Sequence, residues 1–215
     1  MKLFLASYFA GVAKLLPKFL GLPLAGKKVC YIPTASVVEE VDFFVGTSKK
    51  WLAKLGLEID ELEISTAAAN DIAEKIANAD IIFIEGGNTF FLLQELKRSG
   101  ADALIKQRIN AGAPYIGTSA GSMILARDIE YAKHMDATAK APALNGDFTA
   151  LALVDFYVVP HFTNFPFKKA GQKIVEQYGV EFDLKAISNH QAVTVDGDAI
   201  AVVEVERKPK KTAPK

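Results

Sequence analysis

The sequence predicts a three-layer α/β fold, in which a mostly parallel sheet carries helices on both faces. Strand-like and helix-like segments alternate along its 215 residues, which is the pattern of a parallel sheet with crossover helices. Residues 81–84 are apolar without alternation, as expected for a central strand that is buried on both faces. Half of all residues are hydrophobic, which suffices for a sizeable core.

Strands are expected where a short run is apolar or alternates in polarity. In chain order these segments are 2–7, 28–32, 57–64, 81–84, 114–116, 151–159, 186–188 and 192–205. The segment 57–64 alternates apolar and acidic residues, which suits an edge strand. The last segment contains Asp196-Gly197-Asp198, which predicts a turn between two strands.

Helices are expected where apolar residues recur every three or four positions. In chain order these segments are 9–20, 37–55, 69–79, 90–98, 102–111, 122–126 and 167–178. The first should end near Gly21 and Pro23, and Gly46 is a candidate break in the second. Residues 128–147 are polar and irregular in pattern, so we expect a loop there.

No linker, internal repeat or low-complexity segment interrupts residues 1–207, and we expect them to form a single domain. Residues 208–215 contain four lysines and two prolines. Such a short basic end predicts a flexible, solvated tail.

The charge balance and the cysteine content argue against several classes of protein. Lys and Arg total 25, as do Asp and Glu, so no global field attracts nucleic acid or an anionic membrane. No stretch of 18 apolar residues exists, which argues against a membrane-spanning helix. We therefore expect a soluble, cytoplasmic protein. The single cysteine, Cys30, lies in an apolar run and predicts a buried thiol, not a disulfide or a zinc ligand.

The pentapeptide Gly117-Thr118-Ser119-Ala120-Gly121 stands between an apolar run and a helix-like segment. This is the G-x-S-x-G pattern of a nucleophile elbow, in which a sharp turn exposes the serine hydroxyl. The next backbone N–H, from Ala120, lies at the start of the helix and can face an oxyanion. A glycine-rich turn before a helix can also bind phosphate. The pentapeptide alone leaves both readings open.

Three polar segments are expected at the carboxyl ends of strands: Gly86-Gly87-Asn88, Ser119 and His161. In open α/β sheets, sites form at that edge, so we expect the three to converge. The Gly87 N–H could then serve as a second oxyanion donor opposite Ala120. A phosphate site at Gly86-Gly87 is the alternative, although the chain has neither of the common nucleotide-binding glycine motifs.

His161 is a candidate general base for Ser119, and such a base needs a third group to orient it. The acidic residues between the two are Asp128, Glu130, Asp136, Asp147 and Asp155. Residue spacing does not choose among them, apart from Asp155, whose apolar neighbours favour a structural role.

Taken together, the segments 86–90, 117–121 and 160–164 resemble the corresponding motifs of the peptidase E family of aspartyl dipeptidases, in the same order and at comparable spacing. The resemblance covers roughly residues 2–205. It implies a flavodoxin-like fold, akin to the class I glutamine amidotransferase domains. Those amidotransferases carry cysteine at the elbow, whereas this chain has Ser119.

The resemblance implies Ser119 as nucleophile, His161 as base, and Gly87 and Ala120 as oxyanion donors. It favours Asp136 as the acid, with Glu130 as the alternative. Asn88 and Thr118, inside the matching motifs, are expected to contact substrate. No metal or organic cofactor is implied.

The implied substrates are short peptides, including dipeptides that begin with aspartate. Known aspartyl dipeptidases are expected to bind the acidic side chain with an arginine after the histidine motif. Residues 165–173 contain only lysines as cations: Lys168, Lys169 and Lys173. Arg127 and Lys133 are other candidate partners, so preference for aspartate stays open.

Two other functions are weighed against a serine peptidase. A small-molecule esterase would use the same elbow, but only 42 positions separate Ser119 from His161, which leaves little room for the usual strands. A non-catalytic binding protein on the same fold is the other alternative, because the acid is uncertain. The sequence does not decide the oligomeric state, and a homodimer is left open.

Overall fold

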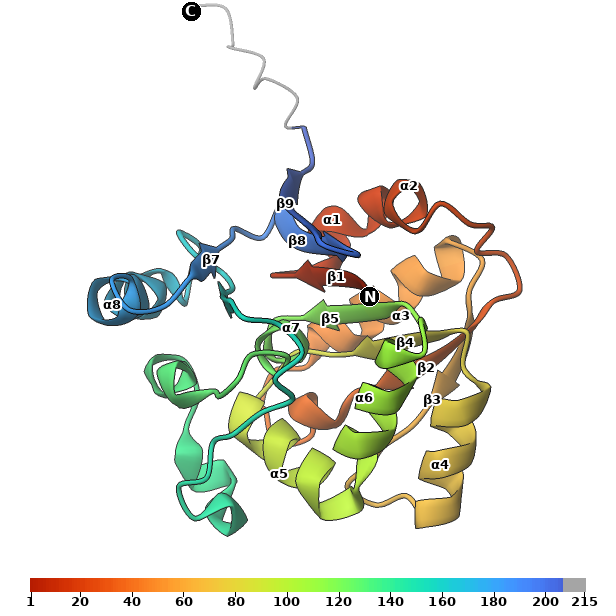
Figure 1. Ribbon diagram of the computed structural model, residues 1–215, viewed down its shortest axis with the longest axis horizontal. Coiled ribbons are helices and arrows are strands. Elements are labelled where there is room, and N and C mark those ends of the chain that lie inside the picture. Colours follow the sequence, from red (N-terminus) through yellow and green to blue (C-terminus); the bar gives the residue numbers. More distant parts are fainter. Residues whose placement is uncertain (207–215) are drawn as a thin grey trace, which may run out of the picture.

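The computed structural model describes residues 1–206 and has three layers, with one sheet between two groups of helices (Figure 1). In spatial order the strands of this sheet are β3 (Glu58–Glu61), β2 (Lys28–Ile32), β4 (Ile81–Ile84), β5 (Tyr115–Thr118), β1 (Lys2–Ala6), β8 (Gln191–Asp196) and β9 (Ala199–Glu204). The first five run parallel, and β8 and β9 form an antiparallel hairpin beside β1. The predicted tail, 208–215, lies outside the described residues.

The strand order confirms the predicted fold class. The series β3-β2-β4-β5 has the 2-1-3-4 order of flavodoxin-like sheets, and β1 occupies the next position. Because β2, β4, β5 and β1 are parallel, their carboxyl ends share one edge of the sheet. Ligand sites of doubly wound folds form at this edge.

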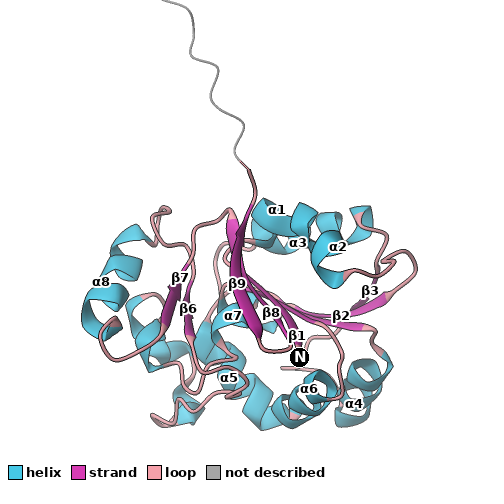
Figure 2. Cartoon of the chain, turned by 45° about the horizontal axis from the view of Figure 1, so that its top comes forward, coloured by secondary structure: helices cyan, strands magenta, loops and turns pink. Residues whose placement is uncertain are grey.

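Helices cover both faces of the sheet (Figure 2). One face carries α1 (Phe9–Val12), α2 (Leu16–Leu20) and α3 (Phe43–Lys54), and the other carries α4 (Ala69–Asn78), α5 (Thr89–Ser99) and α6 (Ala101–Asn110). Side chains alternate along each central strand. Leu3 and Leu5 of β1 therefore enter the core under α4, α5 and α6, while Phe4 and Ala6 enter the core under α1, α2 and α3.

Several predicted elements differ from the structure in their bounds, and two differ most. The helix expected over 37–55 begins only at Phe43, and the preceding residues form part of a cavity wall described below. The strand expected over 151–159 is reduced to β6 (Tyr157–Val159), which pairs with β7 (Leu184–Ala186) in a separate two-stranded sheet.

The apolar run before β6 is buried without being a strand. The N–H groups of Leu151 and Leu153 donate to carbonyls of residues 124 and 125, at 3.0 and 2.8 Å. Leu151 and Phe156 are 1% and 2% exposed. Apolarity here therefore reflects burial against the segment after Ser119, and it does not distinguish a buried loop from a buried strand.

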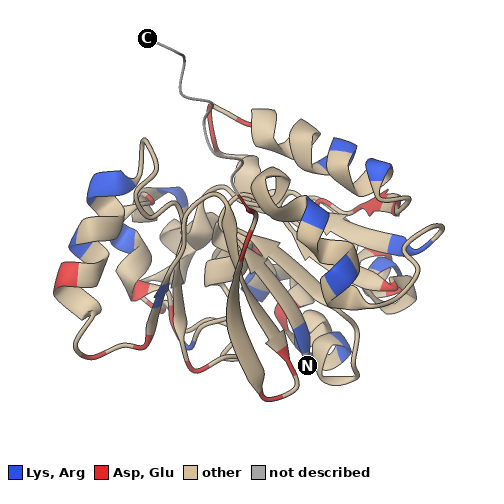
Figure 3. Ribbon diagram, turned by 90° about the horizontal axis from the view of Figure 1, so that it is seen from above, with Lys and Arg blue, Asp and Glu red and all other residues tan. Residues whose placement is uncertain are grey.

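Other predictions are confirmed. The strand within 57–64 lies at the edge of the sheet, and Cys30 is fully buried. Burial raises the pKa of the Cys30 thiol to about 12. Within residues 1–206, none of the helices has the length and apolar character needed to cross a bilayer. Charges of both signs are interspersed over the ribbon (Figure 3).

Candidate active site

Ser119 stands at the turn between β5 and the short helix α7 (Ala120–Met123). Its backbone has φ 49° and ψ −112°, a conformation that a residue with a side chain adopts only when its surroundings impose it. The turn brings α7 close to β4, since a Cβ on Gly121 would lie 2.2 Å from the Ile84 carbonyl oxygen. This contact explains the glycine after the serine, and the turn leaves Ser119 partly exposed.

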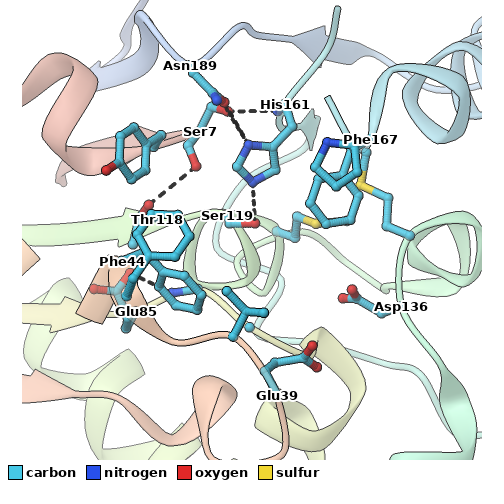
Figure 4. A pocket seen from close by; sticks show the side chains of 18 of the residues that line it. Ser7, Glu39, Phe44, Glu85, Thr118, Ser119, Asp136, His161, Phe167 and Asn189 are labelled. Atoms are coloured by element: carbon cyan, nitrogen blue, oxygen red, sulfur yellow. Dashed lines mark hydrogen bonds between the residues drawn. The ribbon is translucent and has the colours of Figure 1, made fainter. Parts of the chain in front are cut away.

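The histidine predicted from the sequence lies beside this serine. His161 Nε2 is 3.0 Å from Ser119 Oγ (Figure 4). His161 follows β6, so it reaches the edge of the main sheet from the separate small sheet and not from a main-sheet strand. The residue has φ 56°, and its ring stacks on Phe167 at a centroid distance of 5.0 Å.

The other ring nitrogen contacts an amide instead of a carboxylate. His161 Nδ1 lies 2.7 Å from Asn189 Oδ1. Ser7, at the carboxyl end of β1, donates its hydroxyl to the same oxygen at 2.9 Å and accepts the His161 backbone N–H at 2.7 Å. An amide oxygen only accepts, so Nδ1 carries the proton. Nε2 is then free to accept the Ser119 hydroxyl proton.

The expectation that Asp136 orients His161 does not match this geometry. Asp136 Oδ2 accepts from the Thr89 backbone N–H at 2.8 Å and from the Thr89 hydroxyl at 2.5 Å. Thr89 begins α5, and a helix N-terminus attracts a carboxylate. The alternative, Glu130, is exposed and pairs with Lys133.

The loop predicted to hold an oxyanion lies against the serine. A Cβ on Gly86 would come within 3.0 Å of Ser119 Cβ. Gly87 has φ 137°, and a Cβ there would lie 2.1 Å from the Ala35 carbonyl oxygen. Within residues 1–206, neither the Gly87 N–H nor the Ala120 N–H donates to a protein acceptor. Gly87 lines the cavity in front of Ser119, whereas Ala120 is fully buried beneath the turn and is not among the lining residues.

A cavity of about 470 Å³ opens in front of Ser119 and His161, a size typical of small-ligand sites. Thr118 lines it and donates its hydroxyl to the Ser7 carbonyl at 3.3 Å. Asn88 is not among the lining residues. Its side chain caps α5 by accepting the Phe91 N–H at 2.9 Å and donates to the Ala137 carbonyl at 3.2 Å. The expected substrate contact of Asn88 is thus not supported.

Burial changes the pKa values of three groups that line the cavity. It lowers the pKa of His161 below its ordinary value, partly offset by the hydrogen bond to Asn189. It raises the pKa of Asp136 to about 6, and the neighbouring Glu39 acts in the same direction. It raises the pKa of Glu85 to about 7. Perturbed groups concentrated in one cavity are typical of active sites.

Sequence reasoning missed Ser7, Glu39 and Asn189. The same positional rule that selected Ser119 would have selected Ser7, because Ser7 also ends a predicted strand. Asn189 lies between two predicted strands, and a neutral asparagine is not among the acids expected to orient a catalytic histidine. Glu39 was assigned to a helix that begins only after it.

The fold and the site define a serine hydrolase on a flavodoxin-like sheet, and the comparisons with known proteins agree. The family model described as peptidase family S51 matches residues 3–203, so the chain belongs to this family of serine peptidases. The expected resemblance to peptidase E is confirmed.

An uncharacterised peptidase from Pasteurella multocida is 52% identical over 92% of this chain and 94% of its own length. Peptidase E of Shewanella denitrificans is 37% identical over 65% of this chain and 55% of its own length. The crystal structure of a Listeria monocytogenes protein described as a peptidase E superposes with a TM-score of 0.90 at 47% identity, over 95% of this chain and 98% of that one.

Proposed function

We propose that the protein hydrolyses short peptides through a Ser119-His161-Asn189 relay, with the Gly87 and Ala120 N–H groups as the oxyanion hole. The observation that carries this proposal is the continuous series of contacts from Ser119 Oγ to His161 Nε2, at 3.0 Å, and from His161 Nδ1 to Asn189 Oδ1, at 2.7 Å. A serine is a useful nucleophile only beside a base that is itself oriented.

In the first half-reaction, Ser119 Oγ attacks the scissile carbonyl carbon while His161 Nε2 takes the hydroxyl proton. The carbonyl oxygen becomes an anion that accepts the Gly87 and Ala120 N–H groups. His161 then gives its proton to the leaving amine, and the C–N bond breaks. Water attacks the acyl-enzyme with His161 again as base, which releases the acid and restores Ser119.

Asn189 holds the imidazole in the tautomer that this cycle needs. As a neutral amide it adds no negative charge beside the imidazolium that forms. The cysteine peptidases of the papain type use histidine and asparagine in the same relation. The amide therefore fits a working relay, with less electrostatic support than a carboxylate provides.

The cavity volume of about 470 Å³ favours substrates of two or three residues over folded proteins. The test is hydrolysis of a dipeptide and tripeptide library, followed by liquid chromatography and mass spectrometry. Wild type should release free amino acids, and Ser119→Ala should release none. If wild type cleaves simple esters but leaves the peptides intact, the esterase alternative is favoured. If it cleaves neither, a binding protein is favoured.

A further inference from the structure

The wall of the cavity beside Ser119 is acidic. Three carboxylates line it, from Glu39, Glu85 and Asp136. Among the described residues that line it there is no lysine or arginine. The one basic group is His161, whose pKa burial lowers. A neutral or cationic ligand therefore suits this cavity better than an anionic one.

Asp136 directs one carboxylate oxygen into this space. Both hydrogen bonds from Thr89 end on Oδ2. Within residues 1–206, Oδ1 has no hydrogen-bond partner, and it is not among the buried unpaired atoms. Figure 4 shows the carboxylate pointing into the cavity from the side opposite the loop of Glu85. Oδ1 is thus a preformed acceptor for a ligand.

Glu39 adds a second carboxylate close to the first, near enough to raise the pKa of Asp136. Lys140 Nζ contacts Glu39 Oε1 at 2.9 Å and the Val38 carbonyl at 2.6 Å, and also lowers the pKa of Asp136. One lysine beside two carboxylates leaves a negative charge uncompensated. Glu85 is different, because it is 1% exposed and accepts from the Tyr31 hydroxyl and the Gly86 N–H.

Apart from the carboxylates and the polar groups around Ser119 and His161, the wall is mainly apolar. Its large side chains include Val41, Phe43, Phe44, Met123, Phe165 and Phe167. Phe43 and Phe165 are 67% and 94% exposed, and a group of exposed apolar side chains around one cavity is typical of a binding site. Apolar residues of a bound peptide would cover this surface.

We infer that the cavity binds the free N-terminal ammonium group of a peptide whose N-terminal residue is apolar, with Asp136 as its main partner and Glu39 as the second. The inference rests on the proposed function, because it assigns the substrate class of that site. Every unblocked peptide carries its ammonium one carbon away from the first carbonyl, so a single acidic wall suits an enzyme that cleaves after the first residue. An aspartate at that position would bring another carboxylate to this wall, so we expect such dipeptides to bind weakly.

Binding is measured by isothermal titration calorimetry on the Ser119→Ala protein, which cannot turn its ligands over through Ser119. The four probes are Leu-Leu, N-acetyl-Leu-Leu, Asp-Leu and Nα-acetyl-Lys-Leu. The last one keeps an ammonium group but moves it to the side chain. Leu-Leu should bind about tenfold or more tightly than each of the other three, as expected for a charge-assisted hydrogen bond.

Adding Asp136→Asn to Ser119→Ala should reduce the preference for Leu-Leu over N-acetyl-Leu-Leu to within about threefold. The matched control is Asp155→Asn, the same change on a side chain that is 86% exposed and pairs with Arg127. It should leave the preference unchanged. If Asp136→Asn fails to fold, as judged by thermal unfolding, Glu39→Gln is tested in its place. It should also reduce the preference for Leu-Leu over N-acetyl-Leu-Leu, but by less.

The inference is overturned when N-acetyl-Leu-Leu, Asp-Leu or Nα-acetyl-Lys-Leu binds as tightly as Leu-Leu, or when none of the four binds measurably. Hydrolysis by wild type separates this result from the proposed function. If Leu-Leu binds with the expected preference but wild type does not cleave it, the relay is wrong and the ammonium site stands. If wild type cleaves blocked or acidic dipeptides best, the relay stands and the ammonium site is wrong.

Discussion

Asn189 Oδ1 lies 2.7 Å from His161 Nδ1, in the position where serine hydrolases with an acidic third member hold a carboxylate. Ser7 donates to the same oxygen at 2.9 Å and accepts the backbone N–H of His161. Ser7, at the end of β1, and Asn189, in the loop before β8, thus fix the plane and the tautomer of the imidazole.

Replacing this amide should impair catalysis. Asn189→Ala removes the acceptor of Nδ1–H, and we expect kcat/KM to fall by roughly 10- to 1000-fold. The lower figure corresponds to the loss of one hydrogen bond, and the higher one to the loss of the correct tautomer. Asn189→Asp keeps the acceptor and adds charge, so it should retain activity and raise the pKa of His161. The control is Asn110→Ala, at the exposed end of α6. Wild-type activity in Asn189→Ala would exclude this residue from the relay.

The activity should survive to unusually low pH for a histidine-dependent enzyme. The base must be neutral to accept the Ser119 proton, and burial lowers the pKa of His161 below 6.5. The rate of serine labelling by an uncharged fluorophosphonate should therefore reach half its maximum below pH 6.5. This probe has no ammonium group, so the titration of Asp136 does not enter the profile directly. A midpoint near pH 7 or above would contradict the buried environment of the ring.

Glu85 should make the protein less stable as pH rises. Burial raises its pKa from 4.5 to about 7 in the folded state, so between those values the folded protein binds more protons than the unfolded chain. The free energy of unfolding then falls with rising pH, by roughly 3 kcal/mol between pH 4 and pH 8 from this group alone. Glu85→Gln should remove that part of the slope in urea denaturation. Equal slopes in both proteins would show that the pKa of Glu85 does not differ between the folded and unfolded states.

Adding one methyl group at Gly87, in the loop proposed to hold the oxyanion, should strongly reduce activity. A Cβ at Gly87 would lie 2.1 Å from the Ala35 carbonyl oxygen, so Gly87→Ala must displace the loop and its N–H group. We expect a loss of 100-fold or more in kcat/KM, the scale of losing one oxyanion donor. Gly112→Ala is the control, because Gly112 also has positive φ but nothing lies within 4 Å of its Cβ position. Similar activities of both variants would contradict the assignment of the loop.

Much of the fold follows from local pattern. The central strands are continuously apolar and the surface helices are amphipathic, so their positions along the chain were predictable. The small sheet of β6 and β7 was not, because Leu151, Val154 and Phe156 are buried without belonging to a strand. The start of α3 at Phe43 was missed because the valines of residues 37–42 suggested a helix, whereas Val37 is exposed and Val41 lines the cavity.

The site was predictable in part for a similar reason. Ser119, His161 and Gly87 lie where strands end or glycines break the chain, and the sheet rule brings such points together. The partner of Nδ1 depends on how the loop before β8 folds back toward β1, which no local pattern encodes. Asp136 was favoured by the resemblance to the peptidase E family, but the N-terminus of α5 holds its carboxylate.

The central claim is that Ser119 is activated by His161. Intact-mass analysis after fluorophosphonate treatment tests it most directly, on wild type, Ser119→Ala and His161→Ala. The account predicts one adduct on wild type, none on Ser119→Ala, and little or none on His161→Ala in the same time. An unlabelled but folded wild-type protein, or labelling that persists in Ser119→Ala, would contradict it.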